Sequence, residues 1–200
     1  MRTMNTETVW KKMLGGNRRY VAELSPQADI CAQRRRDTVA GQHPCAAVVA
    51  CSDSRVPVEH LFDMGVGDLF VVRVAGNVIG IHEAESLEYA LEHLHVQLLL
   101  VLGHTECSAV NAALSGYAAN GATGAIIKKI RPAVDRARAQ NLGASGAVLL
   151  RAACIENVHQ AMSDLYTFSP AVKAATANGT ATVAGALYDI ETGEVVGLNA

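Results

Sequence analysis

The sequence predicts an α/β fold in which a mostly parallel central sheet of four to five strands is flanked by helices. Short apolar runs rich in valine and leucine alternate with longer stretches of helical periodicity. Glycine is abundant, at 17 residues, whereas aromatic residues make up only 4%. This composition is typical of helices that pack closely on a parallel sheet. The length of 200 residues suits one domain, and we expect residues 1–200 to form it.

The apolar runs define the strands. Continuous runs of this length are typical of strands that are buried on both faces of a parallel sheet. In order, the predicted strands cover residues 46–50, 69–74, 98–102 and 182–188, and a turn over 189–193 leads into a last short strand at Val195.

Helices are predicted between these strands and before the first one. Residues 5–24 form an amphipathic pattern with Val9, Met13, Tyr20 and Leu24 as candidate core positions. The other predicted helices cover residues 57–64, 82–95, 107–120, 124–140 and 147–167. Ligands of such folds bind at the carboxyl ends of the strands, so we look for the site there.

Charge and hydropathy exclude several classes of protein. There are 17 basic and 19 acidic residues, so no cationic surplus indicates nucleic acid as a partner. The longest nearly apolar run, 96–102, is far short of the ~20 residues that span a bilayer, so we expect no membrane partner. Residues 1–12 are charged and show no secretory signal, which favours a cytoplasmic location.

The chain has five cysteines: Cys31, Cys45, Cys51, Cys107 and Cys154. An odd number in a chain without a secretory signal favours reduced thiols or a metal site over a disulfide framework. We expect Cys31, Cys45 and Cys154 to be buried thiols, because free cysteine behaves as a small hydrophobic residue.

Two cysteines and a histidine occupy positions that suit a metal site. His104 follows the predicted strand 98–102, and Cys107 lies three residues later, where a helix begins. Cys51 follows the strand 46–50 and would supply a third ligand. Two thiolates and an imidazole bind Zn²⁺ well and leave a fourth position open, as in catalytic zinc sites. The spacing alone is a weak signal, and a helix-capping cysteine with a structural histidine is the alternative.

A second motif, Cys51-Ser52-Asp53-Ser54-Arg55, places a carboxylate and a guanidinium beside the first candidate ligand. Asp53 and Arg55 are close enough in sequence to form a compact ion pair. Most Asp-x-Arg triplets are ordinary surface pairs on loops, so this motif by itself does not establish a site.

Read together, three segments resemble the beta-class carbonic anhydrases: CSDSRVP at 51–57, GDLFVVRVAGN at 67–77 and GHTEC at 103–107. The segments GNRRY at 16–20, SLEYA at 86–90 and GALYD at 185–189 are similar to that family too. The resemblance therefore covers almost the whole chain in order.

The resemblance implies a zinc enzyme that reversibly hydrates CO₂ to bicarbonate. Cys51, His104 and Cys107 would hold one Zn²⁺ per chain, and Asp53 with Arg55 would form the catalytic dyad. Zinc lowers the pKa of bound water, and the ionised Asp53 would orient the resulting hydroxide because a carboxylate only accepts hydrogen bonds. Because two thiolates weaken this effect of zinc, we expect activity to rise toward alkaline pH.

The resemblance also assigns the substrate pocket. Gln42 matches a family glutamine that points into the pocket, and Ser108 stands where the family usually has glycine. Asp53 would become a fourth zinc ligand only in a closed state of the site. Val48 stands where members with bicarbonate-controlled closure often have tryptophan, which favours an open site.

The family fold implies a homodimer in which the N-terminal helix packs on the partner, and such dimers can pair into homotetramers. Two other functions stay open. Ser108 could adapt the same zinc site to hydrolyse carbonyl sulfide or carbon disulfide, or the chain could be a catalytically silent protein that binds bicarbonate.

Overall fold

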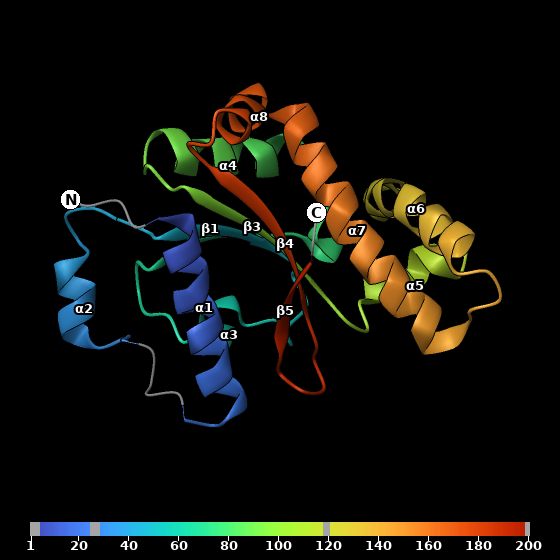
Figure 1. Ribbon diagram of the computed structural model, residues 1–200, viewed down its shortest axis with the longest axis horizontal. Coiled ribbons are helices and arrows are strands. Elements are labelled where there is room, and N and C mark those ends of the chain that lie inside the picture. Colours follow the sequence, from blue (N-terminus) through green and yellow to red (C-terminus); the bar gives the residue numbers. More distant parts are fainter. Residues whose placement is uncertain (1–4, 25–28, 118–120, 199–200) are drawn as a thin grey trace.

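A five-stranded sheet forms the centre of the molecule in the computed structural model, which describes residues 5–24, 29–117 and 121–198 (Figure 1). The strand order is β2-β1-β3-β4-β5. The first four strands are parallel, and β5 runs antiparallel to β4. Their bounds are β1 Ala46–Ala50, β2 Leu69–Arg73, β3 Leu98–His104, β4 Thr182–Tyr188 and β5 Val195–Leu198. The predicted fold class is confirmed.

Helices cover both faces of this sheet (Figure 1). Helices α1 and α3 pack on one face, and α4, α7 and α8 pack on the other. Helices α5 and α6 pack beside α7 at one end of the sheet. Their bounds are α1 Thr6–Val21, α2 Ala32–Asp37, α3 Val58–Leu61, α4 Ile81–Glu92, α5 Ser108–Leu114, α6 Ala122–Gln140, α7 Gly146–Phe168 and α8 Pro170–Ala177.

The two core layers follow from the alternation of side chains along the strands. In β1, Val48 contacts the layer under α1 and α3, whereas Val49 contacts the layer under α4 and α7. All residues of β1 and β3 are buried. A strand covered on both faces needs apolar residues at every position, which explains why these runs are continuously apolar.

A buried asparagine fixes α1 to the rest of the molecule. The side chain of Asn17 donates to the backbone oxygens of Leu61 (3.1 Å) and Gly193 (2.9 Å) and accepts from the backbone N–H of Val195 (2.9 Å). Next to it, a Cβ on Gly16 would lie 1.8 Å from the backbone oxygen of Phe62, so only glycine allows this close approach. These contacts give the GNRRY segment a physical role.

Several expectations need correction. Helices α2 and α8 are not among the predicted elements, although Ser169, which caps α8, and the following Pro170 form a recognisable helix start. Leu24 is 71% exposed rather than in the core, because α1 ends at Val21. Cys31 is also exposed, since it caps α2 by accepting from the N–H of Arg34.

Other predicted helices have different ends. Helix α3 is a single turn, shorter than the predicted 57–64, and α5 ends at Leu114 rather than 120. Residues 118–120 of that prediction lie outside the described residues. In the described part of the chain, none of the helices has the length and apolar character needed to cross a membrane.

Candidate metal centre

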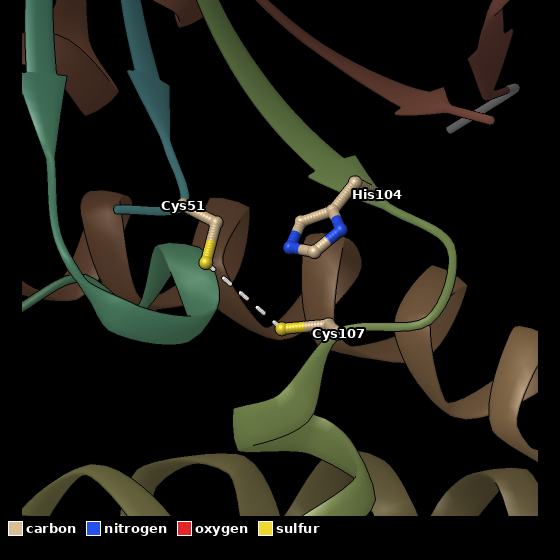
Figure 2. A group of neighbouring side chains, drawn as sticks. All are labelled: Cys51, His104 and Cys107. Carbon is tan, nitrogen blue, oxygen red and sulfur yellow. Dashed lines mark hydrogen bonds between the residues drawn. The ribbon is translucent and has the colours of Figure 1, made fainter. Parts of the chain in front are cut away.

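Two neighbouring strands bring the three candidate ligands together. Strands β1 and β3 pair in parallel, with Ala50 opposite Leu102, so Cys51 and His104 emerge at the same edge of the sheet. Cys107 lies directly before α5. The ligand atoms of Cys51, His104 and Cys107 all lie within 4.8 Å of one another, and the three side chains point into one common space (Figure 2).

A tight turn carries Cys107 back toward His104. Glu106 has a φ of 55°, a left-handed conformation that reverses the chain between the two ligands. The backbone N–H of Thr105 donates to the carbonyl oxygen of Tyr188 at 2.9 Å, which fixes the turn to the end of β4. The sequence indicates convergence of these ligands, and the structure shows the turn that produces it.

The imidazole of His104 presents one free nitrogen to the site. Its Nδ1 lies 2.7 Å from the carbonyl oxygen of Thr105. A carbonyl only accepts, so Nδ1 carries the proton and Nε2 keeps its lone pair. His104 is 1% exposed, and its Nε2 has no hydrogen-bond partner among the described residues. A buried nitrogen with a free lone pair is compatible with a metal ligand.

The sulfur of Cys51 is surrounded by donors. It accepts from the backbone N–H of Gly76 at 3.2 Å and of Asp53 at 3.4 Å. The Cys107 thiol, 4.0 Å away, lowers the pKa of Cys51 to about 4 by hydrogen bonding, and the two backbone donors act in the same direction. Hydrogen bonding to the Cys51 sulfur raises the pKa of Cys107 in turn. A divalent cation would displace this remaining proton, because thiolates are the form that binds metals.

The donor set is compatible with a zinc site. Zinc–sulfur bonds of about 2.3 Å in a tetrahedron place two sulfurs about 3.8 Å apart, and the sulfurs of Cys51 and Cys107 are 4.0 Å apart. Two sulfurs and a neutral imidazole suit this metal better than Mg²⁺ or Ca²⁺, which prefer oxygen. Three protein ligands leave one position open for chemistry.

Asp53 lies at the rim of this cluster and is held by Arg55. One carboxylate oxygen of Asp53 is 4.0 Å from Nε2 of His104. Arg55 donates from Nε (2.9 Å), from Nη2 (2.8 Å) and from its backbone N–H (3.0 Å) to the same carboxylate. Hydrogen bonding from the Arg55 side chain holds the pKa of Asp53 well below its usual range. Asp53 is therefore ionised and accepts hydrogen bonds only.

Of the two residues expected in the substrate pocket, Ser108 lies at the edge of the Cys51, His104 and Cys107 cluster, and Gln42 lies apart from it. Ser108 is the first residue of α5, exposed and directly after the candidate ligand Cys107. Gln42 is exposed in the loop before β1, whereas Cys51 follows the other end of that strand. Five strand residues span about 16 Å. Gln42 and the cluster thus lie at opposite ends of β1 within one chain.

Arg73 supports the loop that carries Cys51 and Asp53, a role that the sequence analysis did not assign to it. From the end of β2, it donates to the carbonyl oxygens of Cys51 (3.1 Å) and Asp53 (2.6 Å). These bonds hold the loop that carries the ligand and the carboxylate. The segment VVRVAGN contains the signal, since an arginine ends an otherwise apolar strand next to a candidate site.

The fold and this donor set define an α/β protein with a candidate metal centre at the carboxyl ends of its parallel strands. The family model described as carbonic anhydrase matches residues 46–195. Carbonic anhydrase 2 of Mycobacterium tuberculosis is 35% identical over 98% of this chain and 94% of its own, and the carbonic anhydrase of Mycolicibacterium smegmatis is 37% identical with the same coverage.

A solved Coccomyxa beta-carbonic anhydrase, in complex with acetazolamide, superimposes with a TM-score of 0.76 at 29% identity, covering 98% of this chain and 87% of the other. The chain belongs to the beta-carbonic anhydrase family, and the expected class of enzyme is confirmed.

Proposed function

We propose that this chain catalyses the reversible hydration of CO₂ to bicarbonate, with one zinc ion held by Cys51, His104 and Cys107. The observation that supports it best is the position of Asp53, an ionised carboxylate fixed by Arg55 with one oxygen 4.0 Å from the free nitrogen of His104. When bound, zinc supplies the Lewis acidity that ionises water near neutral pH.

In this proposal, Asp53 orients the attacking oxygen. A carboxylate that only accepts hydrogen bonds takes the O–H of the nucleophile, so a lone pair of that oxygen faces the carbon of CO₂. Arg55 fixes the carboxylate and keeps it ionised. Because Asp53 is paired with Arg55, it would act as a fourth zinc ligand only after leaving Arg55, in a closed state of the site.

The test is stopped-flow CO₂ hydration on metal-analysed protein, from about pH 6.5 to 9. We expect one zinc per chain and activity that rises with pH. The low pKa of Asp53 keeps it ionised over this whole range, so it does not produce the rise. Asp53→Ala should keep its zinc and lose most turnover, whereas an Asp53→Ala variant with wild-type rates would contradict the dyad.

Assays of sulfide release on the same metal-analysed samples separate the two alternative functions from CO₂ hydration. Zinc-loaded protein that hydrates no CO₂ but releases sulfide from carbonyl sulfide or carbon disulfide would assign the site to those substrates, with Ser108→Gly as the variant to compare. Zinc-loaded protein inactive on all three would be a silent bicarbonate-binding protein. Wild-type protein that binds no zinc would refute the ligand assignment.

We further propose a homodimer in which Gln42 of the partner subunit completes the pocket. Gln42 and Cys51 lie at opposite ends of β1, so within one chain the glutamine amide is remote from the metal centre. The exposed apolar side chains Leu24, Ile30 and Val39 lie in the N-terminal part of the chain, where the partner would pack. A homotetramer would be a pair of such dimers.

Subunit mixing tests this arrangement. Gln42→Ala and Asp53→Ala chains, each impaired alone, should form heterodimers with one intact site if Gln42 acts across the interface. Activity recovered on mixing and refolding supports the proposal. No recovery of activity, or a monomer by sedimentation, contradicts it.

Finally, we propose a cytoplasmic location, since the cysteines of the described chain are free thiols and the exposed Cys31 suits a reducing compartment.

A further inference from the structure

A buried asparagine on α7 is connected to the metal centre through one glycine. Asn157 is 2% exposed and lies on the face of α7 that otherwise buries apolar residues such as Ala153, Ala161 and Leu165. Its Nδ2 donates to the carbonyl oxygen of Gly76 at 2.7 Å, although the two residues are 81 positions apart. A polar side chain on a buried helix face is costly unless a hydrogen bond compensates for the burial, and the bond to Gly76 supplies that compensation.

Gly76 is held from both sides. Its carbonyl oxygen faces Asn157, and its N–H donates to the sulfur of Cys51 at 3.2 Å. The residue has a φ of 68°, and a Cβ there would lie 2.8 Å from Cδ1 of Ile130. The following residue, Asn77, also has a positive φ, of 44°. Gly76 adopts the left-handed conformation without steric cost, whereas the non-glycine Asn77 adopts it at a cost and keeps it only where surrounding contacts impose it.

We propose that Asn157 is a positioning residue of the metal centre: it holds Gly76 so that the Gly76 N–H is aimed at the sulfur of Cys51. This inference rests on the proposed zinc site and extends it to a residue that touches neither metal nor substrate. Groups that hydrogen-bond to a metal ligand fix the orientation of that ligand and tune the metal, and their loss typically lowers metal affinity by about 10- to 100-fold.

The packing of α7 around Asn157 supports a rigid position of this helix relative to the metal centre. Its neighbour Val158 lies against Gly103, where a Cβ would come within 2.5 Å of the valine Cγ2. Gly103 directly precedes the ligand His104. One turn of α7 therefore contacts the backbone beside two of the three ligands: it reaches Cys51 through Gly76, and it lies against the strand end that carries His104.

The test compares zinc affinity in three forms of the whole chain. Asn157→Leu keeps the approximate volume and removes the donor, and Leu165→Ala is the matched control, since Leu165 is fully buried on α7 with no bond to the loop 75–77. Chelator competition should give a zinc dissociation constant at least about tenfold weaker for Asn157→Leu. The constant for Leu165→Ala should stay within about threefold of wild type, even though this variant is less stable.

The absorption spectrum of the cobalt-substituted protein separates a positioning role of Asn157 from a general loss of stability. With Co²⁺ in place of zinc, the thiolate-to-cobalt charge-transfer band of Asn157→Leu should move to longer wavelength, because a sulfur that loses a hydrogen-bond donor gives up electrons more easily. Leu165→Ala should leave the band in place. If Asn157→Leu does not fold, Asn157→Ser, whose hydroxyl is too short to reach Gly76, is judged by the same criteria.

Unchanged zinc affinity and an unchanged band in the asparagine variant, or equal losses in the leucine control, would overturn the inference. These readouts are independent of CO₂ hydration. A wild-type protein that binds zinc but lacks that activity would therefore refute the proposed reaction and leave the role of Asn157 to be decided on its own.

Discussion

Arg55 donates a hydrogen bond to each oxygen of the Asp53 carboxylate, with Nε 2.9 Å from Oδ1 and Nη2 2.8 Å from Oδ2. The same Nη2 also donates to the carbonyl oxygen of Glu106 at 3.1 Å, in the turn that carries Cys107. One guanidinium thus ties the loop after β1 to the turn after β3. Only a planar group with several donors can make these contacts together.

Arg55→Lys should lower kcat/KM about 10- to 100-fold while zinc content stays at the wild-type level. Lysine keeps the positive charge but cannot form the two-pronged bond, so Asp53 loses its fixed orientation. Steady-state CO₂ hydration with metal analysis checks this expectation. Arg35→Lys, an exposed arginine on α2, is the matched control and should be neutral. A fully active Arg55→Lys enzyme would show that the bidentate geometry is dispensable.

Removal of zinc with a strong chelator should abolish activity and lower the unfolding temperature. The ion binds the folded state only, so its binding free energy adds to stability. Zinc or Co²⁺ should restore both properties, whereas Mg²⁺ and Ca²⁺ should restore neither, because the donors are two sulfurs and an imidazole. Calorimetry and hydration assays on the same samples test this, and full activity of the stripped protein is the contrary outcome.

Gly103→Ala should destabilise the fold by about 1–3 kcal/mol, since the added methyl group overlaps Cγ2 of Val158 at 2.5 Å. Gly41→Ala is the control, because no atom of the described residues, apart from its two chain neighbours, lies within 4 Å of a Cβ at that position. Urea denaturation measures both. The double variant Gly103→Ala, Val158→Ala should recover part of the loss, and strictly additive losses would argue against this particular overlap.

Asn17→Ala should lower the free energy of unfolding by roughly 2–4 kcal/mol, because it leaves buried backbone groups of Leu61 and Val195 and the partly buried carbonyl of Gly193 without this partner. Lys11→Ala on the same helix removes only an exposed ion pair with Glu7 and should cost less than about 0.5 kcal/mol. Equal effects of the two variants, measured by urea denaturation, would mean that Asn17 does not anchor α1.

Local sequence patterns were sufficient to predict the bounds of strands that are covered by helices on both faces of the sheet. The run at 46–50 coincides with β1, because a strand buried on both faces of a parallel sheet must be apolar at every position. The run at 182–188 coincides with β4, which is apolar and mostly buried after its exposed first residue, Thr182. Helix ends were less predictable. The exposure of Leu24 and Cys31 depends on where α1 stops and α2 starts, which capping contacts decide.

The sequence by itself determined the types of the candidate metal ligands, their order and their places after strand ends, since these are properties of residue identity and spacing. Only the tertiary structure decided that Arg55 reaches the carbonyl oxygen of Glu106 across 51 residues, that Arg73 reaches that of Cys51, and that Asn157 reaches Gly76 across 81 residues. Such contacts join segments that are remote in the chain. They exist because strands that are distant in sequence pair in a fixed register and bring particular backbone groups within hydrogen-bonding distance, and periodicity carries no information about that pairing.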